Sequence, residues 1–256
     1  MIARVNKKAN LVLTLFVTLL SFTRAQDNGG CKTVTTVEPF DIDMYASAPW
    51  YVQQLAEISY QPIENNYCVK AEYTIRDEPT FWGYSVNVNN QAQDENGQEF
   101  GGGLCAYQSD DTPSKLAVAP CFLPKVFAGP YWIVAYNETE GYALISGGQP
   151  TIQSANSTLC TSGTGINNSG LWIFTRTQQR DQALVDKVRD IAEDAGFDLS
   201  VLNDVDQTLC DVCADSVDGF KNIWGSDVDC SWVDDRNFLR CWFYGEHCPE
   251  TCGLCQ

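Results

Sequence analysis

Residues that commonly carry out catalysis or bind metals are scarce in this sequence. The only histidine, His247, lies in a cysteine-rich stretch near the C-terminal end, so no other region has one to act as a general base or metal ligand. Cys210 and Cys213 have the spacing of a redox pair, but we assign them to different disulfides. Gly101–Gly103 lacks the strand–glycine–helix context of a phosphate-binding loop. We therefore expect no catalytic residue, no metal and no cofactor, and a protein that is not an enzyme.

The N-terminal segment has the pattern of a secretory signal peptide. Arg4, Lys7 and Lys8 precede the apolar run LVLTLFVTLLSF, and small residues allow cleavage after Ala25. The run is shorter than the ~20 apolar residues that a membrane-spanning helix needs. We expect residues 1–25 to be removed and the mature protein to be secreted and extracellular, without a membrane span.

Removal of this segment leaves a strongly acidic protein. Four basic residues and no acidic ones are lost, so 12 basic residues remain against 33 acidic ones, a net charge of −21. Nucleic-acid partners are excluded because phosphate binding needs clusters of Lys and Arg, and anionic membrane surfaces are disfavoured for the same reason. Three sequons predict N-glycans on exposed turns. They lie at Asn137, Asn156 and Asn167.

Export to an oxidising compartment predicts that the 12 cysteines form disulfides. Five of them lie between residues 31 and 160, and seven lie between residues 210 and 255. Both numbers are odd, and assigning Cys210 to the first group gives six in each. The sequence therefore predicts a larger domain over residues 26–210 and a small disulfide-rich module over residues 211–256.

Residues 48–175 have the pattern of an all-β domain. Eight short runs rich in Val, Ile and aromatic residues are separated by turn-forming segments, and VKAEYTIR and YSVNVN alternate between apolar and polar residues. One amphipathic helix pattern follows in RDQALVDKVRDIAEDAGFD, with Asp181 as its N-cap and Gly196 as its stop. Eight antiparallel strands fit either a sandwich or an up-and-down barrel wide enough to hold one small ligand.

Three segments resemble the signatures of the lipocalin family, in the family's order. FDIDMYASAPWYVQQ is similar to the first, PYWIVAYNETEGYALIS to the second and GLWIFTRT to the third. The resemblance covers residues 38–210 and implies an eight-stranded antiparallel β-barrel followed by one helix. It also implies a structural plug, in which Trp50 closes one end of the barrel and Arg176 lies over its indole ring. The first signature departs from the family pattern, because its glycine is absent and Pro49 is inserted.

The likeness extends to NNYCVKAEYT and FDLSVLNDVDQTLC, which are similar to segments of apolipoprotein D and the bacterial outer-membrane lipocalin. In that subgroup the cysteines of these two segments are joined, which implies a bond from Cys68 to Cys210. Two further cysteines flank a turn at hairpin-like separation, and the remaining two are paired by elimination. These expectations give the bonds Cys105–Cys121 and Cys31–Cys160.

The resemblance further implies a dry, apolar cup inside the barrel. By similarity to apolipoprotein D, Tyr73 and Trp172 face this cup, and strand parity adds Tyr84 and Tyr142. A cup of this kind binds a lipophilic small molecule such as a fatty acid, sterol, retinoid, carotenoid or tetrapyrrole. We therefore expect a secreted protein that carries or sequesters a small hydrophobic ligand.

The C-terminal module resembles the ShKT family in its final CPETCGLC and its six cysteines. A module this small needs disulfides because it cannot bury enough apolar surface by itself. No lysine stands between Cys241 and Cys248, where the channel-blocking members carry one, so we expect an adhesion or spacer module that contacts an extracellular or cell-surface protein. The family connectivity implies the bonds Cys213–Cys255, Cys230–Cys248 and Cys241–Cys252.

Two other functions stay open at this point. One is a lipocalin-fold enzyme that resembles violaxanthin de-epoxidase, although only the shared fold supports it. The other is an extracellular interaction protein in which the tail and the glycans matter and the cup is vestigial.

Overall fold

The computed structural model describes residues 30–155, 157–208 and 210, together with short stretches at 220–222, 225–228, 230–233, 240–241 and 248. The expected signal peptide, the sequon at Asn156 and the expected bonds of Cys213 and Cys252 lie outside these residues.

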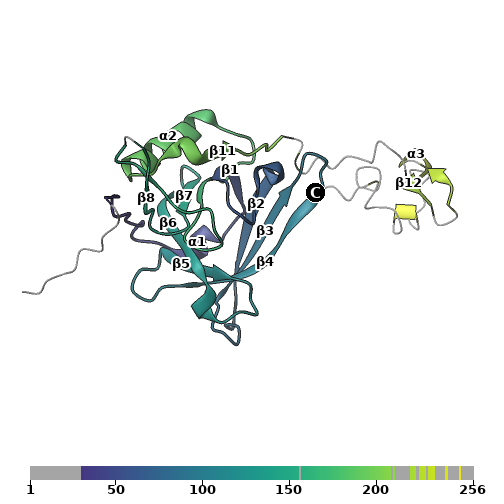
Figure 1. Cartoon of the computed structure of the whole chain (residues 1–256). Helices are drawn as coiled ribbons and strands as arrows, with labels where there is room; N and C mark the ends of the chain where they lie inside the picture. The colour runs from purple at the N-terminus through teal and green to yellow at the C-terminus, as the bar shows by residue number, and fades with distance from the viewer. Residues whose placement is uncertain are drawn as a thin grey trace, which may run out of the picture.

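Eight antiparallel strands close into a barrel (Figure 1). Each strand pairs with the next along the chain, and the last strand, β10, pairs with β1 to complete the ring. This closure excludes a sandwich and confirms the expected fold class, an up-and-down barrel with one main helix. The strands are β1 (Trp50–Ala56), β2 (Tyr67–Ile75), β3 (Val86–Gln93), β4 (Glu99–Gln108), β5 (Lys115–Ala119), β6 (Gly129–Asn137), β7 (Tyr142–Ser146) and β10 (Leu171–Thr175).

Strand β1 pairs with three other strands. Its first residues pair with β2, and its last residues pair on the same side with β11 (Leu202–Asp204), a short strand that follows the helix. On its other side β1 pairs with β10, with a bulge between Val52 and Gln54. The chain therefore returns to the strand with which the barrel begins.

The two faces of the barrel wall pack against different partners. Ala143 and Ile145 of β7 belong to the apolar cluster inside the barrel, whereas Tyr142 and Leu144 of the same strand pack under α2 (Gln182–Asp194) on the outside. Alternate side chains of a strand point to opposite faces, so β7 is buried on both. Figure 1 shows α2 lying across this outer face.

Helix α2 begins and ends at the residues expected from the sequence. The Asp181 carboxylate accepts hydrogen bonds from the backbone N–H groups of Ala183 and Leu184, and Gly196 follows the helix with a φ of 97°, in the left-handed region that favours glycine. Its buried stripe consists of Val185, Val188 and Ala192. Among the residues that the structure describes, no helix combines the length and apolar character needed to cross a bilayer.

Smaller elements complete the described chain. The four-residue helix α1 (Ile42–Tyr45) precedes β1 and is capped by the side chain of Asp41. The other short elements are η1 (Ile63–Asn65), η2 (Lys125–Phe127), β8 (Ile152–Gln153), β9 (Cys160–Thr161), η3 (Leu199–Val201), β12 (Phe220–Lys221), β13 (Asp227–Val228) and α3 (Cys230–Val233).

Four disulfides join described cysteines. In the barrel domain they are Cys31–Cys160, Cys68–Cys210 and Cys105–Cys121, the three pairs expected there. The first two close loops of 129 and 142 residues, so each ties a chain end to a distant part of the domain. The fourth, Cys230–Cys248, is one of the pairs that the ShKT resemblance implies for the C-terminal module.

Candidate ligand-binding site

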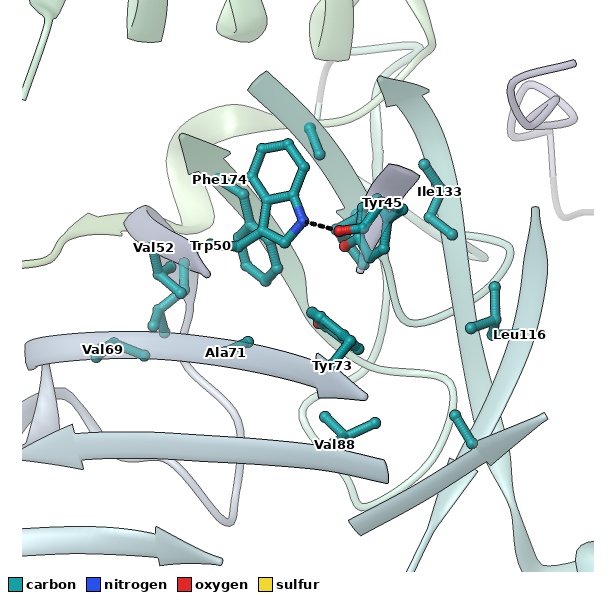
Figure 2. Packing of buried hydrophobic residues seen from close by; sticks show 14 of the residues in the cluster. Tyr45, Trp50, Val52, Val69, Ala71, Tyr73, Val88, Leu116, Ile133 and Phe174 are labelled. Atoms are coloured by element: carbon teal, nitrogen blue, oxygen red, sulfur yellow. Dashed lines mark hydrogen bonds between the residues drawn. The ribbon is translucent and has the colours of Figure 1, made fainter. Parts of the chain in front are cut away.

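One end of the barrel is closed by Trp50, which Figure 2 shows beside Tyr45 and joined to it by a hydrogen bond. The Trp50 side chain has no exposed surface, and its Nε1 donates a hydrogen bond to the Tyr45 backbone carbonyl 2.9 Å away. That carbonyl is available because α1 ends at Tyr45, where a helix leaves carbonyls unpaired. The Arg176 guanidinium lies 3.6 Å from the centroid of the indole ring. The expected stack of Arg176 on Trp50 is therefore present in the structure.

Arg176 is held from several sides at once. Its Nη2 donates to the Met44 and Tyr45 carbonyls, each at 3.0 Å, and its Nη1 donates to the Ala48 and Pro49 carbonyls. Its Nε and Nη2 also contact the Glu138 carboxylate, with a shortest distance of 2.9 Å. These contacts use the donors of the guanidinium and lock the loop before β1 onto the end of β10.

Aromatic rings fill the space behind this plug. Tyr45 lies 5.2 Å from Trp50 between ring centroids, and Phe174 lies 6.4 Å from Trp50 on the other side. Tyr136 contacts both Tyr45 and Trp50 edge to face, and Phe40 packs on Tyr45 at 5.5 Å. The closed half of the barrel interior is thus a packed core, which limits the expected cup to the other half.

Three tyrosine hydroxyls meet inside the barrel. The Tyr131 oxygen lies 2.7 Å from that of Tyr45 and 2.6 Å from that of Tyr73. Burial removes water from these groups, which raises the pKa of Tyr73 to about 12 and the pKa values of Tyr45 and Tyr131 well above their usual range. All three are therefore neutral hydroxyls at physiological pH. We call this group the tyrosine cluster.

The interior is more open toward the opposite end of the barrel. Leu104, Val118 and Trp172 pack on the interior apolar cluster but remain partly exposed, in contrast to the fully buried Tyr45 and Trp50. The partial exposure of these three side chains indicates that solvent reaches the inner wall beside them.

Two further inner-face positions support this opening. Gly102 lies on the same face of β4 as Leu104, and a Cβ placed on it would meet no heavy atom within 4 Å. It pairs with Asn90 of β3, a half-buried side chain between Val88 and Ala92 on the inner face. Open space therefore lies beside the inner wall at Gly102, and the side-chain amide of Asn90 faces it.

The structure divides the four expected cup residues into two pairs. Tyr73 and Trp172 belong to or pack on the interior cluster, on the side expected for them. Tyr84 and Tyr142 do not face the cup, so their expected positions are wrong. Tyr142 packs under α2 on the outside of the barrel, next to Leu144 and Val188.

Tyr84 lies before β3 begins, so the alternation of that strand does not determine its direction. It packs on the outer wall beside the Cys105–Cys121 disulfide, and its hydroxyl donates to the Leu123 carbonyl at 3.0 Å. The loop that follows β5 covers it there. Tyr84 therefore stabilises an outer loop rather than a ligand.

Sequence reasoning missed several residues of the site, including Tyr45 of the tyrosine cluster. Tyr131 completes the tyrosine cluster, Glu138 binds Arg176, and Gly102 leaves space beside the wall. For Tyr131 a signal existed, because it stands two residues before the buried Ile133 on β6 and must share its face. The bulge between Ile133 and Ala135 interrupts this alternation and brings Tyr136 to the inner face as well.

The remaining expected positions lie on the surface of the domain or outside the described residues. Asn137 stands at the end of β6, where its side chain contacts Glu140, and Asn167 lies in an exposed loop. Glycosylation of both stays a prediction. Within the part of the chain that the structure describes, no group of three or more His, Cys, Asp or Glu residues is placed to hold a metal ion.

A cleft of about 770 Å³ lies beside the Cys68–Cys210 disulfide, lined in part by Asn66, Arg180 and Asp206. Cys210 itself belongs to its lining.

Comparisons with protein-family models and with curated proteins find no match. Solved structures with a similar fold include lobster apocrustacyanin A1, with 19% identity over 64% of this chain and 78% of that chain and a TM-score of 0.45. Apocrustacyanin C1 has 17% identity over 69% and 89% of the two chains, with a TM-score of 0.48. The cockroach allergen Per a 4 has 15% identity over 70% and 95%, with a TM-score of 0.46. At these values the similarity carries no information on a ligand.

Proposed function

We propose that the protein binds a small hydrophobic molecule in the open half of the barrel and carries or sequesters it. One observation carries this proposal: Trp50 and Tyr45 are fully buried at the plugged end, whereas Leu104, Val118 and Trp172 on the inner wall are partly exposed, with open space beside Gly102. An apolar wall that water reaches is the arrangement that an apolar ligand stabilises by binding.

Apolar burial supplies the driving force. Transfer of apolar surface out of water contributes about 25 cal/mol per Å². The wall consists mainly of aliphatic and aromatic side chains, so the ligand class includes fatty acids, sterols, retinoids, carotenoids and tetrapyrroles. We assign no catalytic step to the barrel.

The remaining parts of the proposal concern the location and the tail. Residues 1–25 act as a secretory signal peptide, and the disulfides of the described chain support export because such bonds persist in oxidising compartments. The three signature segments support membership of the lipocalin family, in the subgroup of apolipoprotein D. Residues 211–256 form a ShKT-like module that contacts an extracellular or cell-surface protein.

Tryptophan fluorescence tests the binding proposal. We expect titration with retinol or another polyene lipid to quench emission in the wild type, and Trp172→Phe to remove much of that quenching because its ring faces the open half. Trp132→Phe is the matched control. Its neighbour Ile133 faces inward, so Trp132 lies on the outer wall, where Lys115 covers its ring at 4.1 Å. Equal quenching in the two variants, or no quenching and no co-purifying lipid in the wild type, would contradict ligand binding in the barrel.

A further inference from the structure

We infer that the barrel binds a ligand with an uncharged oxygen-bearing end, a hydroxyl or a carbonyl, and that this end lies inward at Tyr131. The inference rests on the proposed function and narrows its ligand class. It favours alcohols and ketones over carboxylates among apolar molecules of equal length.

The position of the tyrosine cluster is the first reason. Tyr45 and Tyr73 have 0% and 6% of their surface exposed, whereas Tyr131 is only half-buried. Tyr131 therefore lies at the boundary between the filled half and the open half of the interior. A ligand that enters the open half therefore meets Tyr131 before it meets Tyr45 or Tyr73.

The hydrogen-bonding capacity of the cluster is the second reason. Each hydroxyl carries one donor and two acceptor lone pairs and rotates to suit its partners. The two contacts of 2.7 Å and 2.6 Å converge on the Tyr131 oxygen. Reorientation of the three O–H groups lets the cluster donate to a carbonyl or accept from a hydroxyl without a change in side-chain position.

The absence of an available positive charge is the third reason. Within the described barrel strands, the positions that share the inner face with the interior apolar cluster carry no lysine, arginine or histidine. Lys70 of β2 and Lys115 of β5 fall on the outer face, because their neighbours Val69, Ala71 and Leu116 point inward. Arg176 is the nearest cation on the plug side, and its donors are taken by Glu138 and by backbone carbonyls. A carboxylate placed at Tyr131 would lose its water without gaining a counter-ion, which is costly in an apolar interior.

Competition binding with matched lipids tests the inference. Full-length protein is loaded with the uncharged fluorophore aminoanthracene, which is displaced at neutral pH by dodecanol, by a methyl ketone of equal chain length and by dodecanoate. Dodecanol is the least water-soluble of these lipids, so its absolute affinity also reflects its solubility. The measured quantity is therefore the ratio of the dodecanoate Kd to the dodecanol Kd, which is compared between variants so that the solubility difference cancels.

Three variants are compared with the wild type by this ratio. Tyr131→Phe removes the central hydroxyl, and we expect the ratio to fall about fivefold, the size expected for one lost hydrogen bond. Tyr73→Phe removes a flanking hydroxyl and should also lower the ratio. It serves as the second test of the cluster in case Tyr131→Phe does not fold. Tyr136→Phe is the control, because its hydroxyl contacts Glu138 at 2.8 Å and lies outside the cluster.

The possible failures are distinguishable. If all lipids displace the probe and the ratio is the same in wild type, Tyr131→Phe and Tyr73→Phe, the inward polar end is wrong and the binding function stands. If no lipid displaces the probe, or the probe itself does not bind, the proposed function is wrong and the inference falls with it. A ratio that falls equally in Tyr136→Phe would also overturn the role of the cluster.

Discussion

The two halves of the barrel interior are built from different residues. At the plugged end Trp50, Tyr45 and Phe174 form a packed aromatic core, and Arg176 is fastened over it by carbonyls and a carboxylate. At the open end the wall includes Gly102 and side chains that stay partly exposed. The same closed ring of strands thus holds one region that stabilises the fold and another in which we propose that the ligand lies. The tyrosine cluster marks the border between them.

The largest expected difference between the two halves is in the loss of stability when one tryptophan from each is replaced by alanine. Trp50→Ala empties a fully buried site and should lower the free energy of unfolding by about 3–5 kcal/mol. Trp172→Ala truncates a partly exposed ring and should cost about 1–2 kcal/mol. Urea denaturation of both variants gives the two values. Equal losses would mean that the open half is packed as densely as the plugged half.

Alkaline pH should destabilise the folded protein through the tyrosine cluster, which lies between the two halves of the interior. In the unfolded chain the tyrosines lose their protons near pH 10, but burial raises the pKa of Tyr73 to about 12 and those of Tyr45 and Tyr131 well above their usual range. The folded state therefore binds more protons above pH 10. The stabilisation by the neutral tyrosines is fully present below pH 10 and is lost above it. The titration of Tyr73 alone should lower the free energy of unfolding by roughly 2 kcal/mol as the pH rises toward 12.

Denaturant unfolding at a series of pH values up to about 11 measures this loss, since tyrosine titrates in that range in unfolded chains. Tyr131→Phe should flatten the dependence, whereas Tyr142→Phe, under α2 on the outer wall, should leave its slope nearly unchanged because the cluster stays intact. A slope that does not respond to Tyr131→Phe would place the titration elsewhere in the protein.

Filling the open half should separate binding from stability. Gly102→Leu adds a side chain on the inner face where nothing lies within 4 Å, so the affinity for an apolar probe should fall about tenfold while stability changes by less than about 1 kcal/mol. Gly103→Leu adds the same group to the adjacent, exposed position, which also has open space around it, and should leave the affinity unchanged. Fluorescence titration and thermal unfolding report both quantities. Equal losses of affinity would show that Gly102 does not border the ligand.

Removal of an outer hydroxyl should have the smallest effect. Tyr84→Phe loses the bond to the Leu123 carbonyl and should cost about 1 kcal/mol of stability, without a change in ligand affinity. Thermal unfolding and probe titration test this. A lowered affinity would indicate that the outer loop after β5 communicates with the open half.

The sequence predicted the plug and the barrel-domain disulfides better than the wall of the cup. Trp50 and Arg176 are marked by signature segments whose order fixes both ends of the barrel, so their stack could be expected. Tyr142 could not be placed by pattern, because β7 is buried on both faces and its apolar run gives no alternation. Tyr84 was misplaced because β3 begins at Val86, two residues later than the tyrosine.

The tyrosine cluster shows a further limit of sequence reasoning. Its members come from α1, β2 and β6, and only the closed fold brings their oxygens within hydrogen-bonding distance. Each tyrosine alone looks like an ordinary core residue. A hydrogen-bonded cluster of this kind therefore cannot be predicted from the residues of any single segment.

The pairing of both β10 and β11 with β1 limits the strand edges through which the protein could aggregate at high concentration. In the closed ring each strand has partners on both sides, and within the described barrel sheet only β11 has an unpaired edge. That edge is three residues long and ends at Asp204, an acidic residue, which makes it a poor template for the strand addition that begins fibril growth. The seam between first and last strands thus protects a β-rich protein from aggregation.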